Sequence, residues 1–188
     1  MVRVLPYDPG WPARAARDLA GLTAALGPLV LHAEHIGSTA VPQMSAKDVI
    51  DLQLSVRDLA EAAEAFGEPL HRLGFTRRPY ELDHVPAGDP SDPALWAKRF
   101  WHRREHPDGD VNLHVRVAGA PNDRLALLFR DWMRAHPDAV AGYSRFKIML
   151  ADQVGDHGAY TDIKDPVVDV VIAAASRWAA QTGWQPHR

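Results

Sequence analysis

A Gly-Ser turn and an acidic strand carry the residues of this chain that are best suited to chemistry. Gly37 and Ser38 follow a short apolar run, and Asp51 comes after a loop, with apolar neighbours on both sides. A Gly-Ser turn at the end of a strand exposes backbone N–H groups and a hydroxyl, which suit a phosphate. A carboxylate on the next strand suits a divalent cation. Together they outline part of a site for a phosphorylated ligand.

Candidate cations accompany this pair. Of the 21 basic residues, only four are lysine, at positions 47, 98, 147 and 164. In a chain that uses arginine so heavily, a lysine indicates that a compact ammonium suits the position. The alternative explanation is that the four lysine positions arose by chance. Lys47, directly before the acidic strand, and Arg99 are candidates for binding a triphosphate or another polyanion.

Side-chain parity decides which polar groups can meet. Polar and apolar residues alternate over residues 49–56 and again over residues 111–117, as expected of strands. The polar positions are Asp51, Gln53 and Ser55 on the first strand and Asn112, His114 and Arg116 on the second. If both strands belong to one sheet, these faces line a single cleft with Ser38 at its rim.

Asp51 and Gln53 are the candidate metal ligands of this cleft. Two-metal nucleotidyl transfer normally uses two or three carboxylates, whereas this face supplies only one. We therefore expect at most a single Mg²⁺, held partly by substrate phosphates. Further carboxylates at positions 48, 83 and 110 lie in loops, where the sequence does not place them.

Each of these features also has a purely structural interpretation. Gly37-Ser38 can be only a tight turn, and His114 a half-buried sheet residue. A metal cluster of His35, His102 and His114 has no supporting spacing. Ser38 as a nucleophile lacks a G-x-S-x-G context.

The elements that must position the site follow from periodicity and from turn signals. Helices are predicted at residues 12–26, 58–73, 123–133 (capped by Asp123), 137–154 and 165–182, and strands at residues 30–35, 49–56, 75–82, 99–103 and 111–117. The strands at 30–35 and 49–56 should be neighbours because their connection is short. This order predicts an α+β fold, a small mixed sheet covered by helices with a helical C-terminal cap. We predict one domain over residues 1–188, its last third helical from about residue 123.

Composition limits the functional classes. Hydrophobic residues make up 46%, charged residues 24%, the net charge is −3, and cysteine is absent. General nucleic-acid binding and membrane binding are not expected, and thiolate chemistry is excluded. No signal peptide or membrane span is recognisable, which favours a cytoplasmic protein.

The motifs resemble known families. Gly37-Ser38, a spacer and Asp51 resemble the signature of the nucleotidyltransferase superfamily, Gly-Ser followed by Asp-x-Asp. More closely, the chain resembles the GrpB family (UPF0157), which is also found as the C-terminal extension of some bacterial dephospho-CoA kinases. The matching segments are residues 6–9 with Trp11, residues 35–42, 47–51, 112–115 and 129–131, Tyr143 with Lys147, and Tyr160 with Lys164.

The resemblance implies a nucleotidyltransferase-like fold with the Gly-Ser turn and the acidic strand at the cleft. Gln53 stands where the superfamily has its second acid, so the site has either changed its chemistry or become a binding site. The phosphate-binding loop G-x-x-x-x-G-K-[ST] is absent, so the chain is not itself a dephospho-CoA kinase.

Two functions follow as hypotheses. The first is metal-assisted nucleotidyl transfer from a nucleoside triphosphate, with Asp51 and Lys47 catalytic. The second is a non-catalytic module, which binds a nucleotide or phosphorylated metabolite or assists the folding or regulation of an unknown protein partner. In both, the ligand is held by Gly37, Ser38, Arg99, His114 and Lys147. On a helix, the four-residue spacing places Tyr143 and Lys147 on one face, either as a solvated stripe or as part of a cap opposite Asp51.

Overall fold

A mixed five-stranded sheet forms the centre of the chain, in the order β1-β2-β5-β4-β3. The computed structural model describes residues 2–186; the ends of the predicted domain, residues 1, 187 and 188, lie outside the described residues. The strands are β1 (His32–Ile36), β2 (Val49–Val56), β3 (Thr76–Arg78), β4 (Lys98–Arg103) and β5 (Asp110–Val117). β2 and β5 are parallel, and the other neighbouring pairs are antiparallel. The predicted pairing of the first two strands is confirmed, with Ile36 opposite Asp51.

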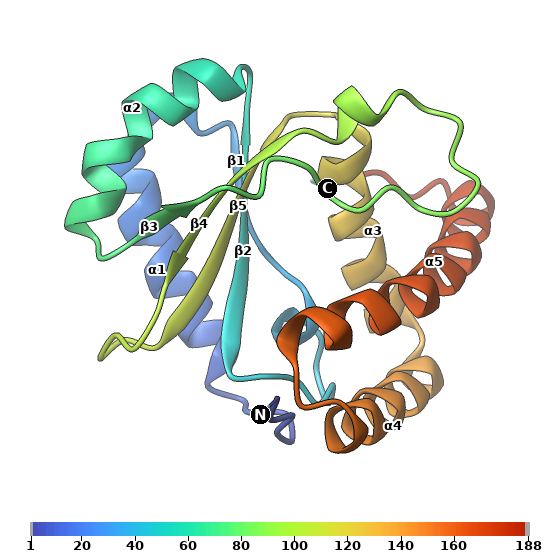
Figure 1. The fold of residues 1–188 in the computed structure, drawn as a ribbon. Helices are drawn as coiled ribbons and strands as arrows, with labels where there is room; N and C mark the ends of the chain where they lie inside the picture. Colours follow the sequence, from blue (N-terminus) through green and yellow to red (C-terminus); the bar gives the residue numbers. More distant parts are fainter. Residues whose placement is uncertain (1, 187–188) are drawn as a thin grey trace.

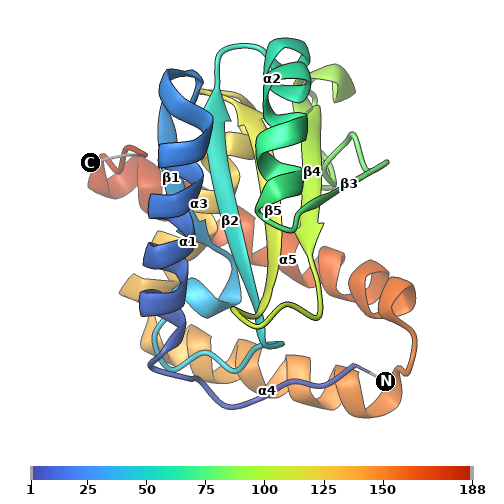
Figure 2. The same ribbon diagram turned by 90° about the vertical axis from the view of Figure 1, so that its left-hand side faces the viewer.

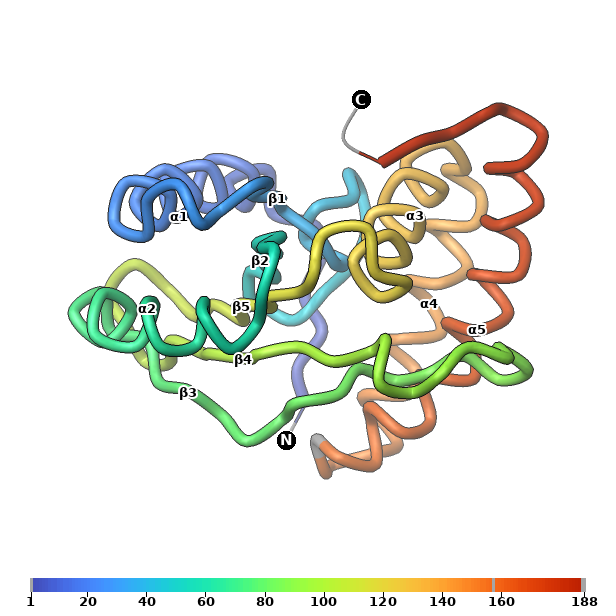
Figure 3. The backbone as a smooth tube through the Cα atoms, turned by 90° about the horizontal axis from the view of Figure 1, so that it is seen from above, coloured from blue at the N-terminus to red at the C-terminus, as the bar shows by residue number. Residues whose placement is uncertain are grey.

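Helices cover both faces of this sheet, which gives three layers (Figure 1). The first face is covered by α1 (Trp11–Leu26) and α2 (Leu59–Arg72), which lie in front of the sheet in Figure 2. The other side carries α3 (Pro121–Ala135), α4 (Pro137–Gln153) and α5 (His157–Thr182), grouped on the right in Figure 3. The predicted α+β class with a helical C-terminal cap is confirmed. Within residues 2–186, none of the helices is long and apolar enough to cross a membrane.

The alternating pattern of β2 sorts its side chains between the two layers. Ile50, Leu52 and Leu54 are fully buried in the core beneath α1 and α2. Burying an apolar side chain of this size contributes about 1.5–3 kcal/mol. The pleat then directs the intervening polar residues of β2 toward α3, α4 and α5.

Several element boundaries differ from the sequence prediction, and three of them bear on the site. Asp123 does not cap its helix, since α3 begins at Pro121 and the Asp123 side chain is buried beneath it. β3 ends at Arg78 rather than continuing to residue 82, because Pro79 has no N–H for the ladder. α5 begins at His157 rather than at residue 165, is capped by Asp156, and contains Pro166 in its interior.

The segment between β3 and β4 leaves the sheet and crosses toward α5, where it is drawn in green in Figure 1. It returns through an isolated bridge between Leu82 and Ala97. Asp169 of α5 holds it at two points: its carboxylate accepts from His84 Nε2 (2.9 Å) and from the Ala87 backbone N–H (3.0 Å). The segment therefore closes one side of the space between the sheet and the C-terminal helices.

Candidate functional site

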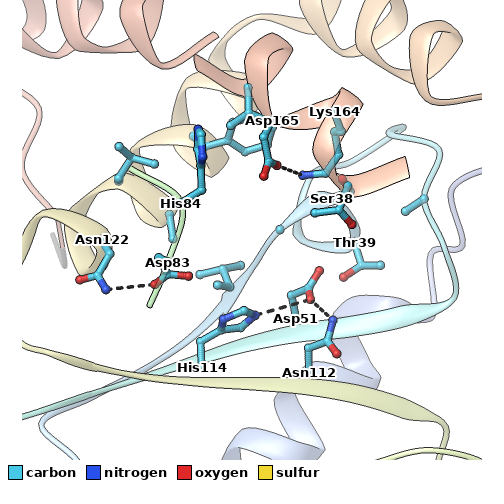
Figure 4. A pocket seen from close by; sticks show the side chains of 18 of the residues that line it. Ser38, Thr39, Asp51, Asp83, His84, Asn112, His114, Asn122, Lys164 and Asp165 are labelled. Atoms are coloured by element: carbon cyan, nitrogen blue, oxygen red, sulfur yellow. Dashed lines mark hydrogen bonds and ion pairs between the residues drawn. The ribbon is translucent and has the colours of Figure 1, made fainter. Parts of the chain in front are cut away.

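A cavity of about 390 Å³ lies between the polar side of the sheet and helices α3, α4 and α5 (Figure 4). It meets the size and mixed polar and apolar character of a small-molecule site. Six residues that the sequence singled out line it: Gly37, Ser38, Lys47, Asp51, His114 and Lys147. They come from four separate segments of the chain, so the fold alone brings them together.

The Gly-Ser turn is built against Asp51. Gly37 has a φ of 70°, in the left-handed region that favours glycine. A Cβ at this position would lie 2.5 Å from Asp51 Oδ2, closer than atoms can pack. Glycine is therefore required here for two independent reasons, and it lets the turn approach the carboxylate.

Two arginines of α3 fix this turn and the end of β1 to the helix. Arg130 Nη1 donates to the backbone oxygen of His35 (3.1 Å) and to Glu34 (2.7 Å). Arg134 donates twice to the backbone oxygen of Ala40, at 3.0 and 2.8 Å. These bonds lie on both sides of Ser38 in the chain, so Arg130 and Arg134 position the turn.

Asp51 is held as an ionised carboxylate at the floor of the cavity. Asn112 Nδ2 donates to its Oδ1 at 2.7 Å, and His114 Nε2 lies 3.9 Å from the same oxygen (Figure 4). Burial acts to raise the pKa of Asp51, but His114, Asn112 and the charge of Lys47 outweigh it, and the pKa lies below its ordinary value. Burial and the nearby Arg116 lower the pKa of His114.

Lys147 reaches the cavity from α4 and contacts Ser38 directly. Its side chain is almost fully buried, and its Nζ donates to Ser38 Oγ at 2.8 Å. The ammonium also lies 4.9 Å from the centroid of the Tyr143 ring on the same helix face. The predicted Tyr–Lys packing is present, but it is buried rather than solvated. Burial first, and then the charge of Lys164, lower the pKa of Lys147 to about 7.

Two further lysines lie at the same cavity. Lys47 Nζ is 5.2 Å from the centroid of the Tyr160 ring of α5. Its pKa is lowered, mainly by burial and in part by Lys164, against the opposing effect of Asp51. Lys164 pairs with Asp165 at 3.3 Å (Figure 4). Three of the four lysines of the chain therefore line one cavity.

The donor set does not fit a magnesium pair. Among the side chains that the structure describes, which are those of residues 2–156 and 158–186, no group of three or more His, Cys, Asp or Glu is arranged to hold a metal ion. Asp51 is accompanied by an amide and by lysines, and cations of the protein repel a divalent ion. Bridging two metals would require carboxylates where the cavity has ammonium groups.

Gln53 and Arg99 do not reach the cavity. Gln53 is fully buried under α3, where its amide donates to Asp123 (2.8 Å) and its oxygen accepts from Arg116. Arg99 pairs in register with Val115, which places it on the α1 and α2 side of the sheet. Lys98, its neighbour, points to the cavity side instead, where its Nζ bonds Asp83 at 2.7 Å.

Sequence reasoning did not place Asp83 or Asn122, which also line the cavity. Burial acts to raise the pKa of Asp83, but Arg116 and Lys98 hold it far below its ordinary value. Asn122 donates to the same carboxylate at 3.0 Å. Asp83 is thus neutralised by protein cations and braces the β3–β4 segment. No signal in the sequence marks it, because its partners come from β4, β5 and α3.

The chain matches the protein family described as GrpB protein over residues 1–174. It belongs to the GrpB family. Relatives of this GrpB chain include a UPF0157 protein of Halalkalibacterium halodurans, 34% identical over 93% of this chain and 83% of that protein. Another is a dephospho-CoA kinase of Mycolicibacterium paratuberculosis, 40% identical over 98% of this chain. The GrpB chain spans about half of that kinase, 48% of its length.

A solved structure shares the fold. The crystal structure of the conserved protein GrpB from Enterococcus faecalis matches with a TM-score of 0.74 and 22% identity, covering 94% of this chain and 99% of the other. This likeness shows the fold alone. A mixed five-stranded sheet with helices on both faces fits the nucleotidyltransferase-like fold that the resemblance implied.

Proposed function

We propose that this GrpB chain binds a nucleotide or another phosphorylated small molecule in the cavity, with Ser38, Lys47 and Lys147 at its phosphates. The observation that carries the proposal is the convergence of three lysines and a hydroxyl from distant segments on one cavity. Ammonium groups and hydroxyls form strong, charge-assisted hydrogen bonds to phosphate oxygens.

Two lysines of the cavity have no carboxylate of the described residues within ion-pair distance, which supports an anionic ligand. Among residues 2–186, the lysine ion pairs are Lys98 with Asp83 and Lys164 with Asp165, and neither Lys47 nor Lys147 pairs with a carboxylate. Burial of the ammonium and the charge of Lys164 cause the low pKa of Lys147, and the charge of Asp51 offsets them only in part. A bound phosphate would supply further negative charge and remove much of this cost.

The apolar lining of the cavity suits the organic part of such a ligand. Its aromatic and aliphatic members include Trp96, Leu125, Phe129, Tyr143 and Val168. A ligand with a flat or apolar portion joined to phosphate matches this division, since binding sites usually combine apolar walls with a few placed polar groups. Nucleotides have this composition.

Nucleotidyl transfer is a second candidate, favoured by the ionised Asp51 that faces the cavity beside Lys47. In that reaction Asp51 would be the carboxylate nearest the reacting phosphate. Lys47 would stabilise the negative charge that develops on the phosphate in the transition state. The non-catalytic alternative is supported by the relatives named dephospho-CoA kinase, in which the matched region is about half of a longer protein.

Isothermal titration calorimetry tests the proposal. Inorganic pyrophosphate and the four common nucleoside triphosphates are titrated into the chain, each with Mg²⁺ and with EDTA. We expect at least one to bind, and Lys47→Met to weaken it about 10- to 100-fold, because a charged hydrogen bond contributes about 1.5–3 kcal/mol. Arg145→Met, which removes one exposed charge from α4, is the matched control. Absence of binding by every probe, or equal weakening by both variants, would overturn the proposal.

A further inference from the structure

We infer that Ser38 is a nucleophile and Lys147 its general base, so that the cavity supports acyl transfer from an ester or thioester of a phosphorylated molecule. The inference rests on the proposed function only for the substrate's phosphate, which in such a substrate is held by Lys47 and Lys164 while the carbonyl group lies at Ser38 and Lys147. The pairing of the two side chains stands on its own geometry.

The distance between the two groups is that of a working nucleophile and base. Lys147 Nζ lies 2.8 Å from Ser38 Oγ, within the range over which a proton passes directly. Serine paired with lysine is one of the known variants of the serine–histidine arrangement. Ser38 is half-buried and lines the cavity, so a substrate can reach its hydroxyl.

The surroundings of Lys147 favour an uncharged amine. Its side chain lies deep in the protein, and two other lysines line the same cavity. With a pKa near 7, a large share of Lys147 is neutral at physiological pH and able to accept the serine proton. The Tyr143 ring lies against the amine and restricts where it can point.

The other candidate bases are engaged elsewhere. His35 Nε2 is 2.9 Å from Thr39 Oγ1, and His114 lies beside Asp51. Asp51 accepts from Asn112 and carries a lowered pKa, which makes it a weak base. Lys147 is thus the group placed to activate Ser38.

The proposed step balances as follows. Ser38 Oγ bonds to the carbonyl carbon of the substrate while its proton passes to Lys147 Nζ. The tetrahedral intermediate collapses as the bond to the leaving alcohol or thiol breaks, and Lys147 returns the proton to that leaving group. An ester on Ser38 remains, which water or an acceptor hydroxyl then cleaves with Lys147 again taking and returning a proton. Lys47 and Lys164 stay available for the substrate's phosphate.

Covalent labelling tests the inference. The chain is treated with a fluorophosphonate, which transfers its phosphonyl group to an activated serine and releases fluoride, and separately with p-nitrophenyl acetate. Peptide mass spectrometry locates each adduct. We expect modification of Ser38 at a rate that rises with pH through about 7 and then levels, as Lys147 loses its proton. Ser38→Ala should abolish the adduct, and Ser176→Ala, an exposed serine of α5, should not change it.

Two variants separate a base from a positioning cation. Lys147→Met and Lys147→Arg should both slow labelling by about 100-fold or more, because neither can accept the proton. Lys147→Arg keeps a positive charge, so it should retain pyrophosphate binding. Absence of an adduct on wild-type Ser38, a flat pH profile, or unchanged labelling in both variants would overturn the inference. Pyrophosphate binding is measured on the same proteins: if it persists while labelling fails, the inference fails and the proposed function does not. If the Lys147 variants do not fold, the pH profile of wild-type labelling alone tests the inference.

Discussion

The buried amine of Lys147 predicts a specific dependence of stability on pH. Its pKa falls from an ordinary 10.5 to about 7 in the folded chain. Between these values the unfolded chain binds the proton and the folded chain does not, so the free energy of unfolding rises with pH. From about pH 7.5 to about pH 9.5 the rise due to this one group amounts to about 2 kcal/mol. Below about pH 7 both states are protonated, and the folded state carries the full penalty.

Urea unfolding of wild type and Lys147→Met at several pH values in that window measures the effect. Methionine fills a similar volume without a charge, so the difference between the two curves isolates the amine. Lys47, whose pKa is also lowered, contributes to both curves alike, and the raised pKa of Tyr143 places its titration above the window. We expect the wild-type curve to rise relative to the variant by about 2 kcal/mol. Parallel curves would show that Lys147 titrates as an exposed lysine and would refute the reasoning about its burial.

Two substitutions test how the site is built. Gly37→Ala should destabilise the chain by at least about 3 kcal/mol. The positive φ alone costs about 1–3 kcal/mol, and the added Cβ also collides with Asp51. Gly142→Ala, in an open helical position, should leave stability unchanged or raise it by about 0.5–1 kcal/mol, and a Gly37 variant as stable as this control would contradict the geometry. Asp83→Asn should cost about 3–5 kcal/mol in urea unfolding, since it leaves Arg116 buried without its counter-charge. A loss below about 1 kcal/mol would show that this ion pair behaves as an exposed one.

The local parts of the fold were predictable from the sequence because their causes are local. The short connection between β1 and β2 predicted their pairing, and alternation in β2 predicted the cavity-facing position of Asp51. Alternation in β5 likewise predicted that His114 faces the cavity. Spacing on α4 predicted that Tyr143 and Lys147 share a face.

The remaining features depend on register and on packing across the chain. Arg99 was a candidate cation, but only the pairing of β4 with β5 determines which face it takes. Gln53 has the parity of Asp51, yet α3 covers that end of β2 and supplies Asp123 as its partner. No sequence pattern predicts the position of either side chain, because each position depends on an element far along the chain.

A crystal structure of the chain with a hydrolysis-resistant nucleoside triphosphate analogue tests the central claim most directly. We predict phosphate oxygens within hydrogen-bonding distance of Ser38 Oγ and of the Lys47 and Lys147 ammonium groups, with the organic part of the ligand against the apolar wall near Phe129. An empty cavity at a ligand concentration that saturates binding in solution, or phosphates bound outside it, would contradict the claim.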